Sequence, residues 1–444
     1  MSRRNAFIAI NRFGLGARPG ELNRIAGDPR GWLENQITAT AAPREFQNLP
    51  PASESAKAFF RSRRQGVKAI RRAYKTYLRK RYFDEINSRA LAHIRSQTPF
   101  AERMVAFWGN HFTVSAKRFF ISPMAGAYER EAIRPHIFGR FEDMLLAAVR
   151  HPAMLLYLDN AGSVGPNSIA GRIIKRGLNE NLAREILELH TLGVGGGYSQ
   201  NDVTEFARIL TGWSVGGIGK RQKLTGVFNY VGFAHEPGSK TLLGKRYTEA
   251  GEAEGTAALK ALARHPSTAR FLATKLARHF IADDPPKDAI RHLERRFLAT
   301  DGDLAEVAKT LIRLAPTWRE PLAKVKTGYE YAISIFRALG VDRQPRKGYL
   351  PILFALGHVP FTAPSPKGWP DRAGDWIAPE SLMRRIELAR AMSTRLPRRI
   401  NPGRFVESTI APIAGVDTRR LVARAPSTDE AMALLFSSPE FQRR

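Results

Sequence analysis

The stretch from Leu178 to Ser214 reads LNENLAREILELHTLGVGGGYSQNDVTEFARILTGWS and carries two helical patterns separated by glycines. At about 100° per residue, its first half places these apolar side chains on one arc of a helix: Leu182, Ala183, Ile186, Leu187, Leu189 and Leu192. The second half opens at Ser199 with Asp202 three residues later, which is close to a capping box. The stretch therefore predicts two helices joined by a glycine turn, with the rest of a helical fold packed around them.

Three polar residues project from the apolar arc of the first helix, namely Asn179, Glu185 and His190. A buried polar group costs roughly 1–3 kcal/mol unless it is hydrogen-bonded, and a buried charge costs more. We therefore expect Glu185 and His190 to be buried and hydrogen-bonded, either to tie helices together or to carry out chemistry. The opposite face of the helix carries a ladder of charges at i, i+4 spacing: Glu180, Arg184 and Glu188.

The composition of the chain is typical of a folded globular protein that is strongly basic. Hydrophobic residues make up 43% of its 444 residues, and 70 Lys and Arg against 41 Asp and Glu give a formal charge of +29. This charge favours anionic partners such as acidic polysaccharide, nucleic acid or a lipid surface. The chain has no cysteine, which excludes disulfides and thiolate metal sites.

The N-terminal residues resemble a twin-arginine signal only in Ser2-Arg3-Arg4. The apolar run that follows extends only from Ala6 to Ile10, whereas a signal peptide needs about 7–15 apolar residues. No apolar stretch reaches the 18 or so residues of a transmembrane helix either. We therefore expect a cytoplasmic protein.

The order of patterns along the chain predicts a mainly α-helical protein in one large family-length unit. Its segments are N-terminal helices and a linker (1–55), a basic helix and helical bundle (56–158), the hallmark loop and helical pair (159–214), a small β-hairpin insertion (215–250) and C-terminal helices (251–444). Within the last segment, helices are predicted at 252–265, 266–281, 287–298, 304–314 and 326–339. A proline-rich loop at 359–376 is long enough to cover a site.

The segment from Lys57 to Arg81 is the most basic part of the chain, with eleven Lys or Arg and no acid. Apolar and aromatic residues recur through it at helical spacing, among them Tyr74 and Tyr77. Aromatic residues interleaved with basic ones can bind nucleic acid or an acidic chain. The alternative is an amphipathic helix whose solvated face is basic, which is what charge runs usually mark.

Several histidines lie at positions that allow both a structural and a chemical role. His111, next to Asn110, ends a predicted helix, where it could act as a cap or as a site residue. His235-Glu236 lie between the two halves of the expected hairpin, as a polar turn or as acid–base groups. His151-Pro152 and His265-Pro266 each begin a helix and are interpreted as helix punctuation. The loop from Gly162 to Gly177, with Lys175 and Arg176, lacks the phosphate-loop pattern.

Blocks of residues along the chain resemble a bacterial domain-of-unknown-function family, numbered eighteen-hundred. The blocks that carry the resemblance are Asn179–Glu185, Glu188–Val194, Gly197–Gln200, Leu210–Trp213, Asn11–Gly16, Trp108–Ser115, His235–Gly238 and Ser438–Phe441. The resemblance implies a mostly helical protein, usually encoded beside a second family whose members often carry twin-arginine signals and resemble the sulfatase and alkaline phosphatase fold. It implies no established reaction and no proven catalytic residue.

One hypothesis for the hallmark residues is an enzyme. Glu185, Glu188 and His190, joined by His111 or Glu205, could bind a divalent metal or act as acid and base in a hydrolase-like reaction. Their spacing is neither H-E-x-x-H nor the E-x-x-H of di-iron bundles. The sequence identifies no cofactor and no metal.

The other hypothesis is a binding or assembly protein that works through its basic surface with an envelope or polysaccharide-handling enzyme. That partner would come from the neighbouring gene and could carry the protein to the periplasm by co-export. The candidate binding residues are Asn110, Asn179, Arg184, Asp202, His235, Glu236 and Trp369. The spacing favours this hypothesis slightly, because it assembles no complete catalytic set, and nucleic-acid binding comes third on charge alone.

Overall fold

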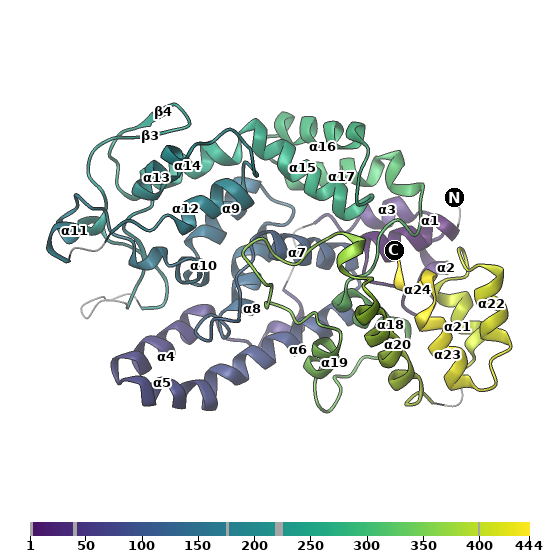
Figure 1. Cartoon of the computed structure of the whole chain (residues 1–444). Helices are drawn as coiled ribbons and strands as arrows, with labels where there is room; N and C mark the ends of the chain where they lie inside the picture. The colour runs from purple at the N-terminus through teal and green to yellow at the C-terminus, as the bar shows by residue number, and fades with distance from the viewer. Residues whose placement is uncertain (1–2, 39–41, 175–176, 218–224, 398–399) are drawn as a thin grey trace.

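Helices form nearly all of the regular structure in the computed structural model, which describes residues 3–38, 42–174, 177–217, 225–397 and 400–444 (Figure 1). Parts of four predicted segments lie outside the described residues: 1–2 and 39–41 of the N-terminal segment, Lys175 and Arg176 of the glycine-containing loop, 218–224 of the insertion and 398–399 of the C-terminal segment. The mainly α-helical fold class is confirmed. Among the described helices, none combines the length and apolar character that crossing a membrane would require.

The first half of the chain forms short and medium helices, several of which contain a wider π-helical turn. The N-terminal and basic segments form α1 (Arg3–Ile8), η1 (Ala9–Phe13), α2 (Glu21–Ile25), α3 (Pro29–Glu34), η2 (Arg44–Phe46), α4 (Ala52–Arg64), α5 (Val67–Ala73), η3 (Tyr74–Leu78) and α6 (Arg79–Arg95). They are followed by α7 (Pro99–His111), α8 (Ala125–Tyr128), η4 (Glu129–Ile133), η5 (Arg134–His136), α9 (Phe141–Arg150), α10 (Pro152–Tyr157) and η6 (Asn160–Gly162). The central segment forms α11 (Ile169–Ile174), α12 (Asn181–Glu185), η7 (Ile186–His190) and α13 (Gln200–Ile209).

The second half follows its predicted boundaries closely through the first five helices. These are α14 (Glu252–Ala263), α15 (Pro266–Phe280), α16 (Lys287–Ala299), α17 (Leu304–Arg313) and α18 (Gly328–Ala338). The remaining helices are η9 (Ala315–Trp318), α19 (Leu350–Ala355), η10 (Ala373–Asp375), α20 (Pro379–Ser393), α21 (Pro402–Thr409), α22 (Val416–Ala423), α23 (Thr428–Ser437) and α24 (Pro439–Gln442). His151 and His265 begin α10 and α15, and each Nδ1 accepts a backbone N–H at 3.1 Å, so both are helix caps.

The β insertion consists of two separate pairs of strands around η8 (Gly232–Ala234). Strand β1 (Trp213–Val215) pairs antiparallel with β2 (Phe228–Tyr230), and β3 (Lys240–Leu242) pairs with β4 (Lys245–Tyr247). The second pair is a hairpin within the second half of the predicted one, so the pairing expected across His235 and Glu236 is wrong. Both of its turn residues, Leu243 and Gly244, have positive φ, as in a type I′ turn. Because β2 pairs with β1, His235 and Glu236 lie between the two pairs rather than at the hairpin tip.

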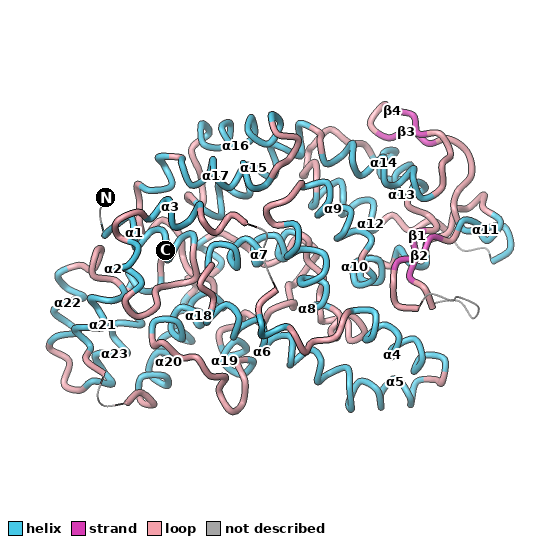
Figure 2. The backbone as a smooth tube through the Cα atoms, turned by 180° about the vertical axis from the view of Figure 1, so that it is seen from behind, coloured by secondary structure: helices cyan, strands magenta, loops and turns pink. Residues whose placement is uncertain are grey.

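The basic segment forms an arm at one end of the molecule instead of a single helix. Helices α4 and α5 lie antiparallel, and both views show their connection pointing away from the body (Figures 1 and 2). The chain reverses at Gly66, whose φ of 99° favours glycine. Phe59 fixes the arm to the body by stacking on Phe120 with ring centroids 5.6 Å apart.

A buried network of arginines and backbone carbonyls joins the N-terminal turn to α7 and α18. Arg103 donates from Nε to the Gly14 carbonyl at 2.6 Å and forms an ion pair with Glu330. Arg337 donates to the Gly16 carbonyl at 2.8 Å. Gly16 has a φ of 102°, and a Cβ there would lie 2.7 Å from Ser334 Cβ, so this close approach requires glycine.

Loss of the Glu330 carboxylate should weaken the fold, because it pairs with Arg103 and also binds Arg444 at 3.3 Å. Replacement by Gln leaves the buried Arg103 guanidinium without its carboxylate and weakens the contact to Arg444, and we expect a loss of about 3–5 kcal/mol in the free energy of unfolding. Glu306→Gln is the matched control: Glu306 pairs with Lys309 and Arg296 near the surface, and we expect less than about 1 kcal/mol there. Urea unfolding followed by circular dichroism compares the two, and equal losses would contradict the proposed role.

Candidate functional site

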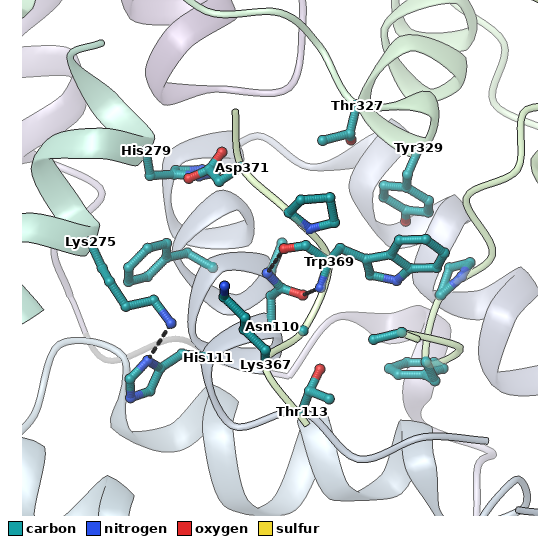
Figure 3. Close-up of a pocket in the computed structure, with 18 of the residues that line it drawn as sticks. Asn110, His111, Thr113, Lys275, His279, Thr327, Tyr329, Lys367, Trp369 and Asp371 are labelled. Atoms are coloured by element: carbon teal, nitrogen blue, oxygen red, sulfur yellow. Dashed lines mark hydrogen bonds and ion pairs between the residues drawn. The ribbon is translucent and has the colours of Figure 1, made fainter. Parts of the chain in front are cut away.

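The described part of the chain contains a cavity of about 700 Å³ between α7, α15, the start of α18 and the proline-rich loop. Its volume is typical of a small-molecule site. The lining is mixed, with an apolar and aromatic wall interrupted by titratable groups (Figure 3). The titratable side chains that reach it include His111, Glu188, Lys275, Arg278, His279, His358, Lys367 and Asp371.

Lys275 and His111 form the closest contact between reactive groups in this pocket. Lys275 Nζ donates to His111 Nδ1 at 3.0 Å, and His111 Nε2 donates to the His190 carbonyl at 3.1 Å (Figure 3). A carbonyl can only accept, so it fixes the tautomer of His111 with the proton on Nε2. The Nδ1 lone pair therefore faces the lysine amine, in an arrangement of amine, base and orienting group.

The surroundings of Lys275 and His111 disfavour positive charge on both. Burial lowers the pKa of His111 well below its usual value, and the nearby Lys275 adds to this effect, so the imidazole is neutral. Burial also lowers the pKa of Lys275 to about 8; Asp371 opposes that shift, whereas Arg278 and Lys367 add to it. No carboxylate of the described residues lies within 4.0 Å of the Lys275 amine. These surroundings favour the neutral amine more than water does.

A second histidine lies one helical turn further along α15 and has a different tautomer. His279 Nδ1 donates to Asp371 Oδ2 at 2.8 Å. Burial alone would raise the pKa of Asp371, but His279, Lys324 and Arg444 outweigh it and lower the pKa to about 2, so the carboxylate is ionised. His279 Nε2 is buried and has no hydrogen-bond partner within the described residues, which leaves a lone pair available to a ligand.

The proline-rich loop forms one wall of the pocket and is held there by Asn110. The Asn110 side chain donates to the Trp369 carbonyl at 2.9 Å and accepts from the Trp369 N–H at 2.7 Å (Figure 3). Gly368 allows this pairing, since its φ is 87° and a Cβ there would lie 2.4 Å from the Asn110 carbonyl oxygen. The Trp369 indole packs on His358 with ring centroids 4.5 Å apart, and its N–H has no partner among the described residues.

The first helix of the hallmark pair, formed by α12 and η7, places Glu188 in the lining of the pocket. Its residues Glu185 and His190 lack the hydrogen bonds expected for them. His190 is buried as predicted, yet neither ring nitrogen is hydrogen-bonded to another described residue. Glu185 is only half-buried, and no hydrogen bond links its carboxylate to another described residue. The helix also departs from the α-helix assumed for the sequence, because Ile186–His190 form the wider π-helical turn η7.

The other polar residues of the hallmark pair connect α12, α13 and the hairpin and do not line the pocket. Glu180 accepts from Arg184 at 2.9 Å and from Thr204 at 2.7 Å. Asn179 accepts from the Asn181 N–H, Asp202 completes the predicted capping box with Ser199, and Glu205 binds Arg208 and the Thr241 N–H. These contacts give the pattern a structural role in joining two helices.

His235 and Glu236 also lie away from the pocket, in a closed polar cluster beside the strands. His235 contacts Glu254 at 3.1 Å, and Lys240 donates to Glu254 at 3.2 Å. Glu236 accepts two hydrogen bonds from Asn167. The cluster explains why the Leu210–Trp213 and His235–Gly238 motifs occur together, since Thr211 hydroxyl accepts the Glu236 N–H at 2.8 Å.

Sequence reasoning reached Asn110, His111, Glu188 and Trp369 but missed the residues of α15 and Asp371. A signal for α15 exists, because Phe271, Lys275 and His279 recur every four residues and share one face of the helix. A solvated helix face gives the same pattern. Only the fold shows that this face lies against a cavity.

The described residues contain no group of three or more His, Asp or Glu side chains arranged to hold a metal ion. The pocket instead offers single polar atoms without protein partners, on His279, Trp369 and Tyr128. Buried groups of this kind are rare in native proteins, and their presence in a cavity indicates a polar ligand or ordered water.

The Asn110 contact can be tested through the loop that it holds. Asn110→Leu removes both hydrogen bonds to Trp369, and we expect faster tryptic cleavage after Lys367, which is exposed on this loop. Asn87→Leu is the control, because Asn87 accepts a backbone N–H from Tyr349 in another loop. Cleavage after Lys367 at the wild-type rate in Asn110→Leu would show that the loop is held by other contacts.

Comparison with known proteins gives one match. The family described as "Protein of unknown function (DUF1800)" matches residues 8–443. Neither the curated proteins nor the solved structures include a match to the chain. The match begins in α1 and ends beyond α24, so it includes every element of the pocket, and the chain belongs to the DUF1800 family.

Proposed function

We propose that the protein is an enzyme that uses Lys275 as a nucleophile on a small carbonyl compound, with His111 as its base. The observation that carries this proposal is the 3.0 Å contact between Lys275 Nζ and His111 Nδ1 in a cavity large enough for a substrate. Lysine amines that are desolvated, or that lie near other cations, are the ones that serve as nucleophiles in proteins. The geometry thus favours the enzyme hypothesis over the binding hypothesis.

The proposed step is formation of an imine. The neutral Lys275 amine attacks the carbonyl carbon, and the proton released from nitrogen goes to His111 Nδ1, whose lone pair already faces the amine. Loss of the former carbonyl oxygen as water completes the imine. His279 is suited to assist, because its free Nε2 can carry a proton while Asp371 holds the other side of the ring.

The proposal predicts an unusually reactive lysine. With a pKa of about 8, about one Lys275 amine in ten is neutral at pH 7, against roughly one in a few thousand for an ordinary lysine. We expect propanal with cyanoborohydride to modify Lys275 at least tenfold faster than exposed Lys260, as measured by peptide mass spectrometry. The rate should rise with pH through 8 and level off above about 9, because protonation blocks the amine below its pKa.

Variants separate the role of the base from that of the amine. Lys275→Met should remove the fast-reacting site, and His111→Asn should slow modification of Lys275, whereas Lys260→Met should leave it unchanged. If Lys275 reacts no faster than Lys260 in the folded protein, the proposed function is wrong.

A second function is favoured by the α4–α5 arm, which we propose binds an anionic polysaccharide. Ten of the eleven basic side chains between Lys57 and Arg81 are exposed. Within the described residues only Lys80 forms an ion pair, with Asp84 at 2.9 Å. Tyr74 and Tyr77 are half-buried, and Tyr74 packs against Phe119, so the arm offers charge without a platform for stacking bases.

Neutralising part of the arm should weaken polyanion binding. We expect replacement of Arg61, Arg63, Arg71 and Arg72 by Gln to lower the salt concentration that elutes the protein from heparin, and to flatten the salt dependence of binding. The control removes the same charge elsewhere, by Gln at four other exposed arginines: Arg343, Arg346, Arg390 and Arg395. Equal effects of both variants would mean that binding follows net charge, and tighter binding to duplex DNA than to heparin would favour nucleic acid.

The arm also supports the proposed partnership with a protein of sulfatase or alkaline phosphatase-like fold from the neighbouring gene. A basic arm could hold the anionic polymer on which such a partner acts. Our proposal for the compartment is the cytoplasm, with co-export to the periplasm on a signal-bearing partner as the alternative. Cell fractionation with and without the neighbouring gene distinguishes the two.

A further inference from the structure

We infer that the substrate is an anionic carbonyl compound whose charged group binds Arg278 and Lys367 while its carbonyl carbon faces Lys275. This inference rests on the proposed function and names its substrate class. Carboxylate and phosphate share the chemistry that these two cations recognise. Three observations support it: the distribution of paired and unpaired charges in the pocket, the position of the two cations relative to Lys275, and the aromatic wall beside them.

Three of the six Lys and Arg residues that line the pocket are already paired with a carboxylate. Arg89 pairs with Glu129 at 2.7 Å, Arg103 pairs with Glu330, and Arg372 pairs with Asp284 at 2.8 Å. Arg278 and Lys367 differ from these, because no carboxylate of the described residues lies within 4.0 Å of either. Arg278 uses Nε to bind the Asp283 carbonyl at 3.3 Å. Its charge therefore remains available to a ligand.

Arg278 and Lys367 approach Lys275 from two directions. Arg278 is three residues after Lys275 on α15 and shares its face of the helix. Lys367 comes from the proline-rich loop opposite, and Figure 3 shows its side chain extending toward the space beside Lys275 and His111. Both cations also lower the pKa of Lys275, in addition to the effect of burial. A substrate held by these two cations would place its next few carbons near the amine.

Two carboxylates of the lining also lack a cation within 4.0 Å. Glu188 acts mainly on its neighbour Glu185, whose pKa it raises in addition to the effect of burial. Asp375 is exposed beyond Trp369, in η10 at the end of the loop.

The apolar part of the substrate has a rigid aromatic wall to contact. Phe271 lies under Lys275, with the amine 5.5 Å from the ring centroid. Across the cavity, Trp369 is fixed through its backbone by Asn110 and through its ring by His358. Its indole N–H is buried without a partner among the described residues, so it can donate to a substrate oxygen.

The test compares 4-oxopentanoate with 4-oxopentanamide, because the remote acid group changes the charge of the ketone and not its reactivity. With cyanoborohydride, we expect 4-oxopentanoate to be trapped on Lys275 at least tenfold faster than the amide. 3-Oxobutyl phosphate, as a third probe, distinguishes a carboxylate site from a phosphate site. Lys367→Met should reduce the preference for the acid to less than threefold, and Lys260→Met should preserve it.

The outcomes separate this inference from the proposed function. If Lys275 traps the amide as fast as the acid, Lys275 is the nucleophile but the inferred anion site is wrong. If neither compound is trapped, the proposed function is wrong, and the thermal unfolding midpoint then decides the anion site. A rise caused by 4-oxopentanoate alone, lost in Lys367→Met, would support the site, and the absence of that rise would overturn it.

Discussion

The buried ion pair between Arg103 and Glu330 is the constraint on which the pocket depends. Arg103 belongs to α7 and Glu330 to the first turn of α18, and both side chains line the cavity. Burial alone would raise the pKa of Glu330, but Arg103 and Arg444 outweigh it and keep the carboxylate ionised. A buried pair adds little net stability compared with apolar residues, yet a shift of either helix would leave a charge without its partner. The pair therefore fixes the register of the two helices that line the pocket.

Buried charges also hold the proline-rich loop that forms one wall of the pocket. Asp371 binds His279 and lies within 4.0 Å of both Lys324 and Arg444, so the loop is joined to α15 by charge as well as by Asn110. These contacts join the loop to residues of other elements, although His279 Nε2 stays without a partner among the described residues. The pocket wall is thus preorganised, which lowers the entropic cost of binding a substrate.

The helices from α14 to α18 could be predicted because local signals determine them: apolar periodicity, prolines at the first turn and capping residues. The strand pairing could not be predicted, because β2 pairs with β1, which precedes it by more than a dozen residues. The site combines both cases. His111 and Trp369 could be selected from their neighbours in the sequence. Lys275 could not, because its role depends on the contact with His111, which is 164 positions away in the chain. The first helix of the hallmark pair also contains the π-helical turn η7, and no composition rule predicts such a turn.

The described residues contain two buried lysine–histidine contacts, which differ in how the charge of the amine is balanced. Lys240 lies 3.2 Å from His235, but the amine also binds Glu254 and the Glu236 carbonyl, so its charge is neutralised. Lys275 has His111 and a cavity, with no carboxylate of the described residues in contact. A buried ammonium without a carboxylate partner weakens the fold. If only stability mattered, Lys275 would be expected to have a carboxylate partner as Lys240 does. Sites that keep such a group unpaired give up stability for reactivity. The open pair is therefore the one on which the proposed function rests.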